Sequence, residues 1–288
     1  MGLKFKVTCP EPTTPNPESR IIKVYIAVDS EGPTGVAEYP RHLAHDEAAV
    51  RRGRELMTAD ANAAVAGCFE AGATEVAVKD DGFLPENIIP ELLDERARLL
   101  PGGGPLLCGL DSSYAGLMLI GFHAMEGAID GVLAHTWSGG RRRRYWINDR
   151  EAGELAVYAI VAGHDCNVPV IMTSGCAGLC REAHELLGPD VVAVAVKRVC
   201  EDGTIDLPAP EETAPLITAG ARDALGRIGT VKPCGVSFPI EMRLQLSDKA
   251  ITDGYIEWRR DNKPDWPGRR LSDTTIGATL ETTKHLNL

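Results

Sequence analysis

Short apolar runs rich in β-branched residues alternate along this chain with longer segments of helical periodicity. The first run, IIKVYIAV at residues 21–28, is almost continuously apolar, as is typical of a strand covered on both faces of a sheet. Alternation of this kind is the signature of a parallel or mostly parallel α/β sheet flanked by helices. The expected strands are residues 21–28, 74–82, 117–122, 168–173 and 191–196, and the expected helices are residues 46–70, 85–100, 151–162, 176–187 and 211–225.

The 288-residue chain is long enough for one large domain or two modest ones. Residues 1–20 are rich in proline and polar residues and are expected to form an irregular extension. The composition shifts at CEDGTIDLPAPEETAP, which indicates a boundary near residue 200. We therefore expect a metal-binding α/β domain at 21–200 and a smaller α+β region at 201–288, with strands near 236–245 and 274–283.

Composition excludes several classes of protein. The net charge of −11 argues against a general nucleic-acid binder, which needs a basic surface. The amino terminus has no apolar signal region, and no run approaches the roughly 20 apolar residues of a membrane helix. A cytoplasmic protein with no membrane partner and reduced cysteines is expected. No GxGxxG motif follows the first strand, so a dinucleotide-binding enzyme is discarded.

An acidic pair follows the first expected strand. Asp29 and Glu31 lie two residues apart in AVDSEG, and the glycines and proline that follow predict a loop. Side chains with this spacing share a face at a strand end and can turn toward one ion. A solvated acidic loop is the ordinary alternative for such a pair.

Two histidines and a glutamate follow the strand expected at 117–122. His123 comes directly after it, His135 follows a glycine-containing loop, and Glu154 lies at the start of the next expected helix. Open α/β sheets place their chemistry at the carboxyl ends of strands. Carboxylates suit Zn²⁺, Mn²⁺ or Mg²⁺, and added imidazoles favour zinc. Taken singly, each residue also has a structural explanation, as a core histidine or a first-turn acid.

Two basic features are further candidates for substrate binding. The arginine run at 141–144, which ends at Arg144, suits recognition of a substrate carboxylate or a contact between subunits, although such runs are usually solvated loops. Lys197 follows the apolar run VAVAV and could point into the same cleft from a strand end.

Several segments together resemble the zinc-dependent D-aminopeptidase family, known from the dipeptide-transport operon of bacilli. The resemblance covers most of residues 21–200 and thins to fragments such as PGRRLSDTTIG beyond them. The segments that carry it are AVDSEGPTG, ELMTADANAAVAGCFEAGATEVAVKDD, GFHA with a second histidine after it, INDREAGELAVYAIVAG and VPVIMTSG.

The resemblance implies a metal site and an assembly. Asp29 would bridge two zinc ions, Glu31 and His123 would hold one of them, and Glu154 would belong to the other. His135 falls on the family's catalytic histidine. The family fold is α/β, and the resemblance implies a homodecamer with its active sites facing an inner channel.

One position departs from the family pattern. The family carries a histidine ligand in an Asp-Ser-His motif, where this chain reads Asp80-Asp81-Gly82. Either Asp80 or Asp81 supplies an oxygen ligand instead, or the second metal is weak or missing. An oxygen ligand would shift the preference from zinc toward manganese or a single ion.

The resulting hypothesis is a metal-dependent hydrolase that cleaves amide bonds in short D-amino-acid peptides. His135 would act as general base or acid, or would orient the oxyanion. Two alternatives stay open. One is an amidase acting on a small non-peptide amide or lactam, and the other is a metal-binding homologue without catalysis.

Overall fold

A seven-stranded sheet forms the centre of the protein. The computed structural model describes residues 21–82, 86–137 and 144–286. The strands run in the order β3-β2-β1-β4-β7-β8-β9 and are parallel except for β9, which is antiparallel to β8. Their bounds are β1 (Lys23–Val28), β2 (Glu75–Asp80), β3 (Ala97–Leu100), β4 (Gly116–Phe122), β7 (Val170–Cys176), β8 (Val192–Val199) and β9 (Ile205–Asp206).

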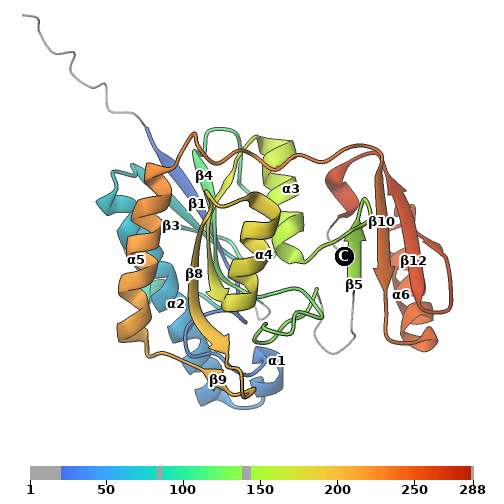
Figure 1. Ribbon diagram of the computed structural model, residues 1–288, viewed down its shortest axis with the longest axis horizontal. Helices are drawn as coiled ribbons and strands as arrows, with labels where there is room; N and C mark the ends of the chain where they lie inside the picture. The colour runs from blue at the N-terminus through green and yellow to red at the C-terminus, as the bar shows by residue number, and fades with distance from the viewer. Residues whose placement is uncertain (1–20, 83–85, 138–143, 287–288) are drawn as a thin grey trace, which may run out of the picture.

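Helices cover both faces of this sheet. Figure 1 shows α2 and α5 on one face and α3 and α4 on the other. The predicted N-cap of α2 is confirmed, because the Asp46 side chain accepts hydrogen bonds from the first-turn amides of Ala48 and Ala49. The helices are α1 (Pro40–Leu43), α2 (Glu47–Glu70), α3 (Glu154–Cys166), α4 (Ala177–Leu187), α5 (Pro210–Gly226) and α6 (Lys249–Asn262).

A second, antiparallel sheet lies beyond α3 (Figure 1). Along β10 the buried residues Ile240, Met242 and Leu244 alternate with exposed ones, so one face is covered. That face shares a core with Val157 and Ile160 of α3, which places α3 between the two sheets. The strands are β5 (Arg144–Ile147), β6 (Arg150–Glu151), β10 (Ile240–Gln245), β11 (Arg269–Arg270) and β12 (Thr275–Leu280).

The predicted fold class, a mostly parallel α/β sheet with a smaller α+β part, is confirmed, but the helix predicted at 85–100 is wrong. The described part of that segment holds a short 3₁₀ turn, Pro90–Leu92, and then β3. Pro90 has no N–H to donate within a helix. Leu99 and Leu100 pair instead with β2, extending the sheet by one strand.

The second sheet takes strands from both sides of residue 200, since β5 precedes that residue and β10 follows it. The domain boundary near residue 200 stays a prediction. Within the described ranges, no helix has the length and apolar character needed to cross a membrane. The cytoplasmic location also stays a prediction.

Candidate metal centre

The centre lies where the strand order of the main sheet reverses, between β1 and β4. From β1 the chain passes to β2 and β3 on one side and returns to β4 on the other. Crevices at such reversal points are where open α/β sheets bind ligands. The two strand ends are joined by backbone hydrogen bonds, from Asp29 N to Ile120 O at 2.9 Å and from Gly32 N to Gly121 O at 2.7 Å.

Glycines allow the segments after these strands to approach this closely. A Cβ atom at Gly32 would lie 1.8 Å from the Phe122 carbonyl oxygen, so no larger residue fits there. Gly121 has a φ of +71°, a backbone conformation that glycine adopts without strain. The acidic loop after β1 and the histidine after β4 are thereby brought side by side.

Asp29, Glu31 and His123 form one group of possible metal ligands. One ligand atom from each lies within 4.8 Å of the others, and all three residues are buried. The Ser30 amide donates to Asp29 Oδ1 at 2.8 Å, and the Ser30 hydroxyl donates to Glu31 Oε2 at 2.6 Å. These bonds fix both carboxylates in the loop.

His123, His135 and Glu154 form a second group, which shares His123 with the first. Glu154 Oε1 lies 3.6 Å from His123 Nε2 and 4.0 Å from His135 Nε2. The same oxygen accepts a hydrogen bond from the Trp137 backbone N–H at 2.6 Å. All five residues predicted for the core of the site therefore meet in one place.

The two imidazoles are held in the same tautomer. His123 Nδ1 lies 3.0 Å from the Ala124 carbonyl oxygen, and His135 Nδ1 lies 2.9 Å from that of Leu133. A carbonyl oxygen can only accept, so Nδ1 carries the proton and Nε2 keeps its lone pair in the neutral ring. Burial lowers the pKa of both histidines, and the neighbouring His123 lowers that of His135 further. Both Nε2 atoms thus face the centre as acceptors.

The protein builds this centre with an excess of negative charge. The pKa of Asp29 is raised well above its usual value, chiefly by burial and then by the nearby Glu31 and Glu154. Three carboxylates this close repel one another unless a proton or a cation lies among them.

The residues fit a bound divalent cation. Asp29 Oδ2 and His123 Nε2 are 3.4 Å apart and fully buried, and neither makes a hydrogen bond within the described part of the chain. Buried polar atoms of proteins are nearly always paired, so this arrangement needs a partner. Mixed imidazole and carboxylate donors are a ligand set that suits zinc.

Asp80 and Asp81 do not join either group. Asp80 Oδ1 accepts from Asn87 Nδ2 at 2.9 Å and Asp80 Oδ2 accepts from the Ile88 amide at 3.0 Å, so this carboxylate holds the loop after β2. Asp81 pairs with the buried Lys79 at 2.8 Å. At Gly82, a Cβ atom would lie 2.7 Å from Asn87 Nδ2, so the Asn87 amide occupies the space that a side chain at 82 would need.

The two basic candidates also lie outside the ligand groups. Arg144 is half exposed and pairs with Glu151 of the neighbouring strand at 2.5 Å. Arginines 141–143 fall outside the described residues. The Lys197 ammonium donates to the carbonyl oxygens of residues 31, 33 and 36, at 2.5, 3.2 and 2.6 Å. These bonds use all three of its donors, so a substrate contact by Lys197 is not supported.

Two residues at the centre were not predicted from the sequence. The Tyr39 ring packs edge-on against His135, with centroids 5.4 Å apart. Glu182 Oε2 accepts from the Met125 amide at 2.9 Å, just after His123, and burial raises the pKa of Glu182 to about 7. A signal for Glu182 existed, because it shares a helix face with the apolar Leu179.

Comparison with known proteins gives one consistent result. The sequence profile of the D-aminopeptidase family matches residues 22–263. A D-aminopeptidase of Bacillus subtilis strain 168 is 34% identical over 215 residues, which cover 74% of this chain and 77% of the relative.

A solved structure extends the match to the fold. It is described as the Zn-dependent D-aminopeptidase DppA from Bacillus subtilis, a self-compartmentalizing protease. The two chains superpose with a TM-score of 0.80 and are 29% identical, over 91% of this chain and 93% of the other.

Proposed function

The chain belongs to the D-aminopeptidase family, and from that premise we propose that it is a zinc-dependent hydrolase of short peptides that begin with a D-amino acid. The observation that carries the proposal is the facing pair of buried, unpaired atoms, Asp29 Oδ2 and His123 Nε2. Together with Glu31 they would hold a zinc ion, and Glu154 would complete the centre from the start of α3. A bound zinc ion supplies Lewis-acid polarisation of the scissile carbonyl.

His135 acts as the general base and general acid in this proposal. Its Nδ1–H is held by the Leu133 carbonyl, so Nε2 is the free acceptor and points toward Glu154. A neutral imidazole in this position takes a proton from the attacking water and returns it to the leaving amine. Because burial lowers its pKa, the ring is neutral and ready to act as a base near pH 7.

The backbone around His135 supports a positioning role for its loop. Leu133 and Trp137, on either side of it, have φ angles of +56° and +62°, which are uncommon for residues other than glycine. Strained conformations of this kind persist where surrounding contacts hold them, and they gather at functional sites. Here the Leu133 carbonyl orients the imidazole, and the Trp137 amide orients Glu154.

A substrate and metal assay tests the proposal. The purified protein should contain zinc and should hydrolyse D-alanyl dipeptides, with activity lost on chelation and restored by zinc. Matched L-alanyl dipeptides and simple amides serve as comparison substrates. Hydrolysis of simple amides alone would favour a small-molecule amidase, and bound zinc with no hydrolysis of any amide would favour a non-catalytic homologue.

A homo-oligomeric assembly is part of the proposal, because the structurally similar relative is described as self-compartmentalizing. The specific form, implied by the family resemblance, is a homodecamer. Light scattering coupled to size exclusion should then give close to ten times the 30.9 kDa chain mass. A monomer at micromolar concentration would contradict this part of the proposal.

A further inference from the structure

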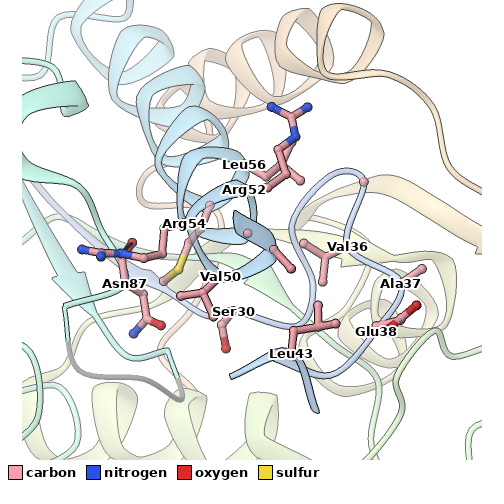
Figure 2. Close-up of a pocket in the computed structure, with 14 residues that line it drawn as sticks. Ser30, Val36, Ala37, Glu38, Leu43, Val50, Arg52, Arg54, Leu56 and Asn87 are labelled. Atoms are coloured by element: carbon pink, nitrogen blue, oxygen red, sulfur yellow. Dashed lines mark hydrogen bonds between the residues drawn. The ribbon is translucent and has the colours of Figure 1, made fainter. Parts of the chain in front are cut away.

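A cavity of about 350 Å³ lies beside the metal centre, between α1, the first turns of α2 and the loop after β1. Figure 2 shows Val36, Leu43 and Val50 gathered around it. Leu56 and Met57 of α2 also line it, and both are buried. Apart from Ser30, the residues that line this cavity have no role in the proposed mechanism.

The cavity and the metal centre share a wall at Ser30. This residue lines the cavity, and its amide and hydroxyl hold the carboxylates of Asp29 and Glu31. A second connection runs through Tyr39, which lies in sequence between the cavity-lining Glu38 and α1, and whose ring packs on His135. A group bound in the cavity is therefore adjacent to the loop that carries Asp29 and Glu31.

The walls of the cavity select for an uncharged occupant. The guanidinium of Arg52 is directed away from Val36 and Leu43 in Figure 2, and its side chain is 63% exposed. Arg54 Nε donates to the Asn87 carbonyl oxygen at 3.4 Å. The third charged lining residue, Glu38, is exposed. Val36, Leu43, Val50, Leu56 and Met57 supply aliphatic walls. Ligand pockets of roughly 300–1,000 Å³ with such walls bind apolar groups.

We propose that this cavity receives the apolar side chain of the substrate residue whose peptide bond is cleaved, and that it selects leucine- or phenylalanine-sized groups over alanine. The inference rests on the proposed function, because it places the scissile bond at the neighbouring centre. A methyl group would leave most of the 350 Å³ unfilled, whereas each added methylene buried against the aliphatic walls strengthens binding.

Substitutions at Val50 test the selectivity on the zinc-loaded full chain. The measured quantity is the ratio of kcat/KM for D-leucyl and D-alanyl p-nitroanilides. Val50→Trp fills the cavity and should lower this ratio about tenfold or more, in line with the value of methylenes in apolar pockets. Val50→Thr keeps the volume and adds a hydroxyl, so a smaller decrease is expected even if the tryptophan variant folds poorly.

The matched control is Ala48→Trp, which adds the same side chain two residues earlier on the helix. Ala48 is exposed and does not line the cavity, so the ratio should stay at the wild-type value. A ratio that is unchanged in both Val50 variants, or that falls equally in the control, would overturn the inference.

Ligand binding separates this inference from the proposed function. Isopentylamine carries an alkyl chain of leucine size on a cationic amine and has no amide bond to hydrolyse. Its alkyl chain should enter the cavity, so calorimetry should detect binding to the wild-type protein and about tenfold weaker binding to the Val50→Trp variant. Binding without hydrolysis of any peptide would refute the proposed function and leave the cavity assignment intact. Hydrolysis with no effect of Val50 on either measurement would refute only the cavity assignment.

Discussion

The imidazole rings of His123 and His135 are stacked, with centroids 3.8 Å apart and an angle of 12° between their planes. Both rings present Nε2 to Glu154, yet the mechanism gives them different tasks: His123 holds the metal and His135 moves a proton. Distance alone does not separate these roles, because both histidines belong to possible ligand groups.

Replacing each histidine in turn separates the two roles. His135→Ala should lower kcat by about 10²–10⁴-fold, the usual contribution of general acid–base catalysis, and should leave the zinc content unchanged. His123→Ala should lose both zinc and activity. Metal analysis after dialysis, together with steady-state kinetics, measures both quantities. Loss of zinc from the His135 variant would make that residue a ligand.

The ligand assignment predicts a contrast between two aspartates. Asp29→Asn should abolish tight zinc binding, because it removes the charge of a carboxylate that has no other partner at Oδ2 among the described residues. Asp80→Asn should keep its zinc and should lose about 1–3 kcal/mol of stability. The side-chain NH₂ group of the new asparagine would face one of the two donors that Asp80 now accepts from, the Asn87 side chain or the Ile88 amide. Metal analysis and chemical denaturation of both variants check this, and zinc loss on changing Asp80 would make that residue a ligand.

Lys197 is expected to anchor the loop that carries Glu31. It is 2% exposed, and Lys197→Met would remove a donor from three carbonyl oxygens, of which that of Pro33 keeps the Val36 amide at 3.2 Å. We expect a loss of about 2–4 kcal/mol of stability and weaker zinc binding, because the Glu31 backbone is released.

The control for Lys197 is the adjacent Arg198→Met on the same strand, where the side chain is 66% exposed. This variant should change stability by less than about 1 kcal/mol and leave zinc affinity unaltered. Competition with a chelator measures the zinc affinity of both variants and so tests whether Lys197 anchors the loop. Equal affinities in the two variants would rule out the anchoring role.

Asp60 is expected to make stability depend on pH. Its carboxylate is buried and accepts from the Thr34 amide at 2.9 Å, and burial raises its pKa from 3.8 to about 6. The folded protein therefore binds this proton more tightly than the unfolded chain does, and ionisation of Asp60 removes stability as the pH rises from about 4 to about 6. The full effect is about 3 kcal/mol at most.

Asp60→Asn removes this titration while keeping an oxygen for the Thr34 amide. The variant should be more stable than the wild type at about pH 8, and the difference should vanish near pH 4. Denaturant unfolding of both proteins at the two pH values measures the difference. A constant difference across the range would show that Asp60 ionises in the folded protein as easily as in water.

The centre was predictable because its residues follow strands that the sequence marks clearly. Asp29 and His123 each come directly after an almost wholly apolar run, and the ends of neighbouring parallel strands meet at one edge of a sheet. The resemblance to the D-aminopeptidase family, stated from the same residues, is confirmed. Assignment of each residue to a ligand or catalytic role stays a prediction.

What was missed depended on contacts between distant segments. The stretch ARLL at 97–100 has helical composition, and only its pairing with β2 makes it a strand. Lys197 was a candidate for substrate binding, since the sequence gives no sign that the loop after β1 would turn its carbonyl oxygens toward it. The position of Asn87 beside Gly82 could not be predicted from sequence either, because it is set by the fold of the loop after β2.

Helix α3 has its first residue, Glu154, at the metal centre and its middle residues, Val157 and Ile160, in the core of the second sheet. A rigid helix transmits any tilt imposed along its length to its end. Changes in how the second sheet is packed or contacted from outside would therefore move a carboxylate at the centre without touching any residue there. Substitutions on the second sheet, far from the centre, can therefore change the catalytic rate. The same connection through α3 allows the activity to be adjusted by engineering the second sheet.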